Sequence, residues 1–154
     1  MTVKVCKFGG TSMADGNVIK NVKKIIDADK QRRFIIVSAP GKRYSGDVKV
    51  TDLLLKCHNE AISHGDVKTA FSAVRARFVS LVKELNIKFD INSVLDETEA
   101  LIESEQSEDF TASRGEYLSA RITSAVLGAK FIDAKDVIFF DKTVRLTVKS
   151  PTKP

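Results

Sequence analysis

The chain has 154 residues, 43% of them apolar, and carries 25 lysines and arginines against 20 aspartates and glutamates, for a net charge of +5. This length and apolar content allow one buried core and argue against disorder. Two cysteines provide neither a disulfide framework nor a four-cysteine zinc site, and no apolar run approaches the ~18 residues of a membrane-spanning helix. No signal-peptide pattern is visible, so we expect a cytoplasmic protein without a membrane partner.

The first elements follow a strand, turn, helix and strand pattern. Apolar residues alternate over 3–8 as in a strand, and two glycines end that run. A one-sided apolar pattern over about 15–31 is typical of a helix, with Ser12 or Asp15 as its N-cap. The continuous apolar run 34–37 is typical of a strand that is buried on both faces of a parallel sheet. Together these elements predict a βαβ unit.

Helical patterns dominate the remainder of the chain. They cover about 53–61, 67–85, 91–102 and 114–127, and Gly128 follows the last one where a left-handed C-cap is expected. The heptad-like stripe over 67–85 lasts under three heptads, which favours core helices over a coiled coil. Short strands are expected at 130–132 and 137–140, and the segment 97–109 is acidic and expected to be exposed.

The segment Lys7-Phe8-Gly9-Gly10-Thr11-Ser12 is the strongest functional motif. It lies where the first strand ends, and glycines there let an anion approach the backbone closely. Lys7 adds a positive charge and two hydroxyls add donors, which is what phosphoryl transfer requires. The order of residues is not that of a Walker A loop. A tight turn followed by a serine N-cap would use the same residues, and spacing alone gives the two interpretations about equal weight.

Three further motifs are ambiguous by themselves. Ser38 follows the second strand, at the sheet edge where ligands bind in open parallel sheets, but turn serines are common there. Thr51 and Asp52 open a helical pattern and are candidate caps. The sequence Ser113-Arg114-Gly115-Glu116 fits a capping box, although Glu116 could instead offer its carboxylate to an ammonium group.

The histidines and cysteines suggest no separate site. His58 and His64 lack companions at metal-ligand spacing and are expected at the surface. Cys6 lies on the first predicted strand and Cys57 on a helix face, so both are expected to be core thiols.

Taken together, these blocks resemble the aspartate kinases of the amino-acid-kinase family. The similarity extends over residues 3 to about 141 and also includes Val37-Ser38-Ala39, Thr51-Asp52-Leu53-Leu54, the continuation Tyr117-Leu118-Ser119-Ala120 and Asp133-Ala134-Lys135-Asp136. The resemblance implies an α/β fold with three αβα layers and a mainly parallel sheet, of which this chain would hold the N-terminal substrate lobe.

The resemblance also implies an activity and roles for individual residues. The activity is the ATP-dependent phosphorylation of the L-aspartate side-chain carboxylate to 4-phospho-L-aspartate, the first step toward lysine, threonine and methionine, with Mg²⁺. Lys7 would stabilise the transferring phosphoryl group and is the expected catalytic residue. The phosphates would contact Lys7, Phe8, Gly9, Gly10, Thr11 and Ser12, and the aspartate would contact Ser38, Thr51, Arg114 and Glu116.

The resemblance stops near Asp141, so we expect two regions, a lobe over 1–141 and a divergent basic tail over 142–154. Residues 1–141 carry 21 basic and 20 acidic side chains, so four tail residues supply most of the net charge. The basic residues at 20–33 lie mostly on one helix without an aromatic platform, and we expect no nucleic-acid partner. The family's nucleotide lobe is expected to be missing, which would leave this chain inactive. The alternative is a non-catalytic interaction or assembly module, and a homo-oligomer is compatible with either.

Overall fold

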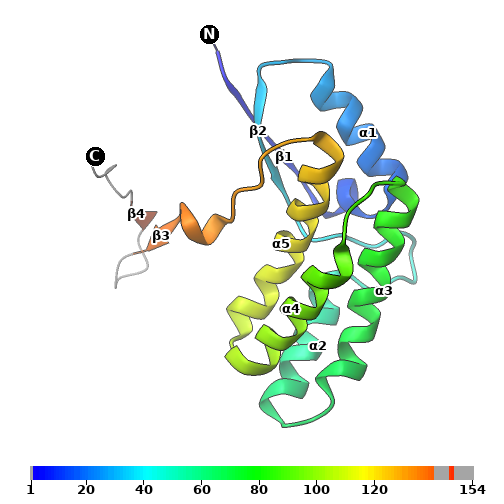
Figure 1. The fold of residues 1–154 in the computed structure, drawn as a ribbon, viewed down its shortest axis with the longest axis vertical. Coiled ribbons are helices and arrows are strands. Elements are labelled where there is room, and N and C mark those ends of the chain that lie inside the picture. Colours follow the sequence, from blue (N-terminus) through cyan, green and yellow to red (C-terminus); the bar gives the residue numbers. More distant parts are fainter. Residues whose placement is uncertain (1, 141–145, 148–154) are drawn as a thin grey trace.

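The computed structural model describes residues 2–140 and 146–147, and all structural statements concern that part of the chain. Two long segments make up most of it, an N-terminal strand–helix–strand unit and a group of four helices (Figure 1). The elements in chain order are β1 (Lys4–Phe8), a 3₁₀ turn η1 (Gly10–Met13), α1 (Gly16–Asp27), β2 (Arg32–Val37), α2 (Val50–Ile62), α3 (Val67–Leu85), α4 (Ile91–Glu105), α5 (Glu108–Leu127), a 3₁₀ turn η2 (Ala134–Asp136), β3 (Phe139–Phe140) and β4 (Leu146–Thr147).

The predicted βαβ unit is confirmed. Strands β1 and β2 pair in parallel, with Val5 opposite Phe34 and Phe8 opposite Val37, and α1 connects them. The Ser38 amide donates to the Phe8 carbonyl at 3.0 Å, so the pairing continues just beyond β2. Because the strands are parallel, the segments that follow Phe8 and Val37 leave the sheet at the same edge. The α/β class with a parallel sheet is therefore confirmed as well.

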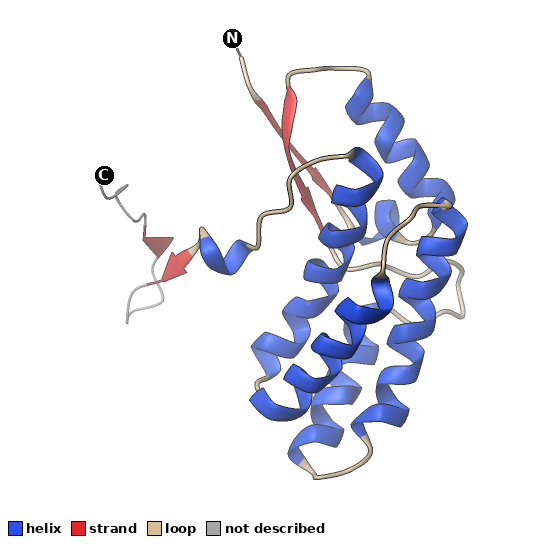
Figure 2. Ribbon diagram, viewed as in Figure 1, coloured by secondary structure: helices blue, strands red, loops and turns tan. Residues whose placement is uncertain are grey.

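Helices α2 to α5 form a bundle that extends away from the end of the sheet (Figures 1 and 2). Each predicted apolar stripe faces its interior, where Leu54, Phe71, Phe78, Leu95 and Leu118 are fully buried. The helices are joined by short turns, so consecutive helices pack side by side. The stripe over 67–85 is thus a core stripe of the bundle, as predicted.

The prediction that β2 is buried on both faces is wrong. Ile35 and Val37 face the helices, but Phe34 is 56% exposed and Ile36 is 52% exposed on the opposite face. Val5, the partner of Phe34, is 63% exposed. The described residues place helices against one face of the sheet only, which leaves an apolar face bare.

The start of α1 differs in detail from the expected one. Asp15, not Ser12, is the N-cap, and its carboxylate accepts hydrogen bonds from the Asn17 and Val18 amides at 2.8 and 3.0 Å. The Glu84 carboxylate accepts from the Gly16 amide at 2.7 Å. Helix α1 therefore begins only at Gly16, and residues 10–13 form a separate 3₁₀ turn. Since the protein itself satisfies the first amides of α1, this helix end offers no phosphate site.

Two further cap predictions are wrong. Helix α5 begins at Glu108, where the Ser107 hydroxyl accepts from the Phe110 amide at 3.2 Å, so 113–116 lie inside the helix and form no capping box. Helix α2 begins at Val50 with Lys49 at its N-cap position, so neither Thr51 nor Asp52 caps it. The first turn of α5 lies in the acidic stretch that we expected to be simply exposed. Its Glu108 and Asp109 instead suit a helix N-terminus.

The C-terminal segment has less strand than predicted. Gly128 adopts the expected left-handed C-cap (φ 61°), but residues 130–132 form no strand, and the strand expected at 137–140 covers only Phe139–Phe140. This strand pairs antiparallel with Leu146–Thr147, and the pair lies away from the body of the molecule (Figure 1). Apart from Leu146–Thr147, the expected basic tail 142–154 lies outside the described residues.

His58 is buried, which corrects its expected surface position, whereas His64 is exposed. Cys57 is buried as expected, and Cys6 is half-buried. Within the described ranges, none of the helices is both long enough and apolar enough to cross a bilayer.

Candidate active site

The segments that follow β1 and β2 are packed backbone against backbone at the predicted edge of the sheet. The Gly41 amide donates to the Gly10 carbonyl at 2.9 Å. A Cβ on Gly41 would lie 2.9 Å from the Gly10 carbonyl carbon, and one on Gly10 would lie 3.0 Å from the Ala39 oxygen. The first distance is shorter than Cβ contacts in proteins, and the second is tighter than most of them. Gly10 and Gly41 are therefore glycines because two loops must touch there.

Gly9 has a different environment. A Cβ on Gly9 would meet nothing within 4 Å, and its backbone (φ −78°, ψ 175°) is extended and open to any residue. The fold therefore favours a glycine at position 10 and places no such constraint on position 9. Open space above a glycine at a strand end fits the close approach of an anion. The turn interpretation of this motif accounts for Gly10, and the phosphate interpretation accounts for Gly9.

Segment 38–41 also contacts α5, and one of the contacting residues is Glu116, which was predicted to bind aspartate. The Glu116 carboxylate accepts from the Ala39 amide at 3.2 Å. The preceding residue, Gly115, is buried against Ala39, since a Cβ there would lie 2.6 Å from that of Ala39. A glycine at position 115 thus lets α5 approach the loop closely enough for Glu116 to reach it.

Thr51 reaches the same place through the backbone. The Val50 amide donates to the Pro40 carbonyl at 3.2 Å, which brings the first turn of α2 back to the end of β2. Loop 40–50 is thereby closed at its base, in the manner of an Ω-loop. Ser38, Thr51 and Glu116 come from three different elements and meet around the four residues that follow β2.

Several polar side chains of this region form no hydrogen bond or ion pair within the described part of the protein. Lys7 is exposed on β1, opposite Ile36 and on the bare face of the sheet. In the described part of the chain, its ammonium group has no ion-pair or hydrogen-bond partner, and neither do the hydroxyls of Thr11, Ser12, Ser38 and Thr51. One cation and four hydroxyls on these segments thus remain available to a ligand. Phe8 contributes only backbone there, because its ring is half-buried against the core.

Arg114 is not brought to this group. Its guanidinium lies 4.3 Å from the centre of the Phe110 ring and 4.7 Å from that of Tyr117. Its Nη2 donates to the Ser113 hydroxyl at 2.9 Å. The side chain is buried, and desolvation lowers the pKa of its guanidinium from the ordinary value. Stacking between two rings of its own helix explains its position without any ligand.

Comparison with known proteins identifies the family to which this fold and loop arrangement belong. The pattern of the Amino acid kinase family matches residues 2–152. The chain belongs to the amino acid kinase family. Aspartokinase 3 of Bacillus subtilis is 32% identical over 149 residues, which cover 90% of this chain and 33% of that relative. The expected resemblance to aspartate kinases is confirmed.

Solved structures of this family agree. The crystal structure of the aspartate kinase of Clostridium acetobutylicum matches 95% of this chain with a TM-score of 0.92 and 45% identity, over 34% of its own length. Aspartokinase III of E. coli, solved with aspartate and ADP, matches 96% of this chain and 35% of its own length with a TM-score of 0.69. At 21% identity, that second likeness shows the fold alone. The chain spans about a third of the length of these relatives.

The sequence analysis of this amino acid kinase chain did not identify the buried residues that contact and position the loop after β2. Asp47 is buried and accepts hydrogen bonds from Arg43 and from the buried Arg77 of α3. The bond from Arg43 is the main reason that the pKa of the Asp47 carboxyl lies well below its usual range. A signal was available, because Asp47 is the only acidic residue between Lys42 and Lys49.

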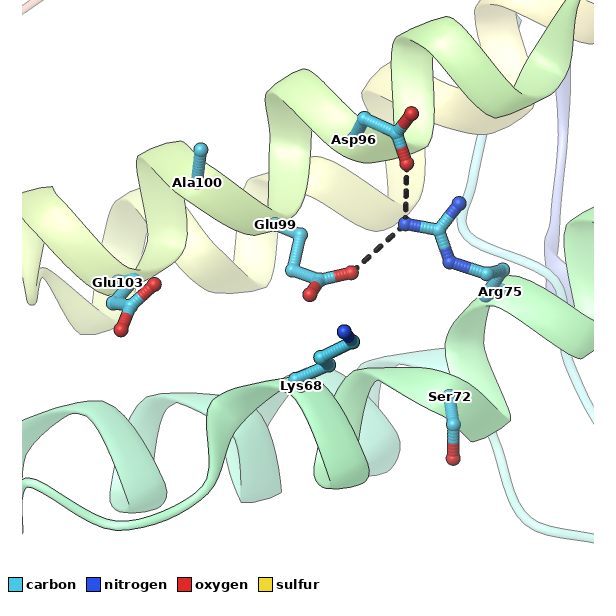
Figure 3. Close-up of a pocket in the computed structure, with 7 residues that line it drawn as sticks. All are labelled: Lys68, Ser72, Arg75, Asp96, Glu99, Ala100 and Glu103. Atoms are coloured by element: carbon cyan, nitrogen blue, oxygen red, sulfur yellow. Dashed lines mark hydrogen bonds and ion pairs between the residues drawn. The ribbon is translucent and has the colours of Figure 1, made fainter.

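Two hollows in the surface help to delimit the site. One, of about 300 Å³, borders the glycine turn and is lined by Phe8, Thr11, Ser12, Val18, Asn21, Val22 and Ile25. The other, of about 480 Å³, lies between α3 and α4 (Figure 3). There Arg75 pairs with Asp96 and Glu99 at 2.8 Å each. The second hollow shares no residue with the candidate site, and Arg75 engages two of its three carboxylates, those of Asp96 and Glu99.

Proposed function

We propose that this chain carries the aspartate-binding and phosphate-binding part of an aspartate kinase, which phosphorylates the side-chain carboxylate of L-aspartate with ATP to give 4-phospho-L-aspartate. We assign this reaction to the first step toward lysine, threonine and methionine, and we propose that the chain is cytoplasmic. The observation that carries the proposal is that the segments after β1 and after β2 and helix α5 contact one another around Ala39, while Lys7 and four hydroxyls on these segments and on α2 have no partner among the described residues. The 32% identity to an aspartokinase, in an alignment that covers 90% of the chain, supports it.

The roles follow from charge. L-Aspartate carries one ammonium and two carboxylate groups, and Glu116 is the carboxylate that reaches segment 38–41, which begins with Ser38 and whose Pro40 carbonyl accepts from the first turn of α2, where Thr51 lies. We assign Glu116 to the substrate ammonium and the two hydroxyls to its carboxylates. We do not assign Arg114 a contact with the substrate. Its guanidinium stacks on Phe110 and Tyr117, and we propose that this stacking stabilises the first half of α5, which carries Glu116.

Phosphate oxygens would lie at the glycine turn. The space above Gly9 is open, Lys7 supplies a cation, and Thr11 and Ser12 supply hydroxyl donors. The substrate carboxylate is already a nucleophile, so no strong general base is required. Two anions must nevertheless approach each other, and Lys7 would lower the electrostatic cost of that approach and of the charge on the transferring group.

The described residues fit phosphate better than they fit the rest of ATP and Mg²⁺. They hold no group of three histidine, cysteine, aspartate or glutamate side chains that could bind a metal ion. Glu116 is engaged with a backbone amide. The hollow beside the turn, which Phe8 lines together with aliphatic and polar side chains, measures about 300 Å³ and so lies at the lower end of the range for small-molecule pockets. We therefore assign phosphate contacts to this chain and derive no step through Mg²⁺. We also propose that the chain on its own does not turn over.

The central test separates binding from turnover. A purified sample with L-aspartate, ATP and Mg²⁺ should give no hydroxylamine-trapped aspartyl phosphate, while NMR titration should show L-aspartate binding near residues 38–41. Formation of hydroxamate would contradict the proposed inactivity. Absence of any L-aspartate-dependent shift in these resonances, at concentrations well above those of cells, would contradict the proposed substrate site.

A substitution tests the ammonium contact. Glu116→Gln keeps an oxygen for the Ala39 amide and removes the charge, so the fold should persist while the affinity for L-aspartate falls about tenfold or more, as expected for loss of a charge-assisted bond. Succinate, which lacks the ammonium group, should bind the two proteins equally. Glu103→Gln in the distant hollow is the matched control. An equal loss for both ligands would reject the assignment.

The alternative, an assembly module, is favoured by one observation. Val5, Phe34 and Ile36 form an exposed apolar patch on the bare sheet face. Such patches are uncommon on isolated domains. Sedimentation of the chain over a wide concentration range, with and without Phe34→Ser, checks this alternative. A homo-oligomer that Phe34→Ser dissociates would support it, and a monomer at all concentrations would reject self-assembly.

A further inference from the structure

The strongest unexplained feature is a buried ion pair behind the candidate site. Arg77 of α3 is 6% exposed and Asp47 is 8% exposed, although the flanking loop residues are exposed. Arg77 donates to the Asp47 carboxylate. Arg43 adds two side-chain bonds to that carboxylate, at 2.7 and 2.8 Å, and a backbone bond at 3.0 Å. The carboxylate of Asp47, the one acidic residue in the basic segment 42–49, is therefore buried and hydrogen-bonded to two arginines.

The same guanidinium holds backbone from two other segments. Its Nη2 donates to the Gly41 carbonyl at 2.8 Å and lies 3.4 Å from the Ala14 carbonyl oxygen. Gly41 in turn donates to Gly10. One side chain therefore connects two points of loop 40–50, Gly41 and Asp47, with Ala14 at the end of the turn after β1.

Stability alone does not explain why this pair is ionic. Burying two charges costs several kcal/mol, and apolar residues of similar size often stabilise a fold at least as well. A planar guanidinium, however, offers several donors in a fixed arrangement, so it can hold a carboxylate and two carbonyl oxygens at once. Lysine has the charge without this geometry. The choice of arginine therefore indicates a requirement for position.

We propose that Arg77 is a positioning residue, which holds the glycine turn and segment 38–41 at the spacing that lets phosphate and aspartate bind together, without contacting either ligand. The identity of the two ligands in this inference rests on the proposed function. The role of Arg77 in holding the two loops together rests only on its contacts in the structure. Because Gly10 and Gly41 touch directly, a small shift of the Gly41 carbonyl is transmitted to the turn beside Lys7.

The test compares Arg77→Lys with Arg75→Lys, the same change two residues away on α3, where the arginine pairs with surface carboxylates of α4. ¹⁵N NMR of the ligand-free chain reads the amides of Gly9, Gly10 and Gly41. Titrations with L-aspartate and with tripolyphosphate measure the affinity for each ligand. We expect Arg77→Lys to shift or broaden the three glycine signals and to weaken both ligands about tenfold, and Arg75→Lys to leave both readouts unchanged.

A second variant covers the case in which Arg77→Lys unfolds. The double change Arg77→Met with Asp47→Leu removes both buried charges and should keep the free energy of unfolding close to that of the parent. If it folds and binds as the parent does, the inference is overturned. Unchanged glycine signals in either variant also overturn it. If the parent binds neither ligand, the proposed function fails, and the glycine signals alone then decide the role of Arg77.

Discussion

The Gly41 amide donates to the Gly10 carbonyl at 2.9 Å, and this single bond joins the loops that follow the two parallel strands. Neither glycine has a positive φ, so backbone strain is not the reason for either. Each is needed because a Cβ would intrude on the other loop. The two segments that bear the proposed phosphate and aspartate contacts are thus one structural unit.

Gly41→Ala should therefore destabilise the chain by about 1–3 kcal/mol, the usual cost of overpacking a site that cannot yield. Gly9→Ala is the matched control, because its new methyl would meet open space, and it should change the free energy of unfolding by no more than about 0.5 kcal/mol. Urea unfolding followed by circular dichroism measures both. The same Gly9→Ala should weaken tripolyphosphate binding, and equal affinity would remove Gly9 from the phosphate site.

Lys7→Ala should separate function from folding. Lys7 is exposed and has no partner among the described residues, so its loss should leave the free energy of unfolding within about 0.5 kcal/mol of the parent. Binding of tripolyphosphate should fall about tenfold or more, because a charge-assisted contact is lost. Lys30→Ala, which makes the same change in net charge at an exposed position, is the control. Equal losses in the two variants would mean that only overall charge matters.

Gly115→Ala should push α5 away from the loop after β2. Its Cβ would lie 2.6 Å from that of Ala39 and 3.3 Å from Leu54 Cδ1, and we expect a loss of about 1–3 kcal/mol together with weaker L-aspartate binding.

Adding Ala39→Gly to Gly115→Ala supplies the matched rescue, since it removes the methyl with which the new one collides. The double variant should recover part of the stability and binding that Gly115→Ala loses, beyond the sum of the separate effects. Strict additivity would show that these two positions do not interact.

The sequence was informative where a pattern is local. Alternation and apolar runs predicted β1, β2 and the bundle helices, and the glycine motif located the loop beside Lys7. The start of α5 was missed because its cap, Ser107, lies within an acidic stretch that looked solvated. The prediction for β2 was wrong because the apolar run shows that both faces of the strand are apolar, but it does not show whether another element covers each face. Phe34 and Ile36 lie on the face that no described element covers.

The interior support of the site could not be predicted for a different reason. Arg77 and Asp47 are 30 residues apart, on a helix and in a loop, and no spacing rule connects them. Glu84 likewise reaches the start of α1 from the end of α3. The sequence contained the ligand-facing residues in recognisable order, but it did not show which distant side chains hold them in place.

The two cysteines should differ sharply in reactivity. Cys57 is buried, its thiol donates to the Leu53 carbonyl at 3.2 Å, and burial raises its pKa to about 11. Cys6 is half-buried on β1. Titration with a disulfide reagent at pH 8 should modify one thiol in the folded chain and two in denaturant, because only the thiolate reacts. Cys6→Ser should abolish the fast phase. Rapid reaction of both thiols would contradict the buried position of Cys57.

Acid should weaken the fold through Asp47. Its hydrogen bonds with Arg43 and Arg77 lower the pKa of its carboxyl in the folded state, whereas the unfolded value is about 3.9. A depressed folded pKa contributes stability that is complete above the unfolded pKa and is lost as the pH falls below it. Asp47→Asn should therefore destabilise the chain by about 3–5 kcal/mol at pH 7, as breaking a buried pair does, and by progressively less from about pH 4 downward. Glu97→Gln, at an exposed and unpaired position in the described part of α4, is the control. Urea unfolding at several pH values measures the difference, and a constant gap between parent and Asp47→Asn down to pH 2 would show that this carboxylate is not held as an ion.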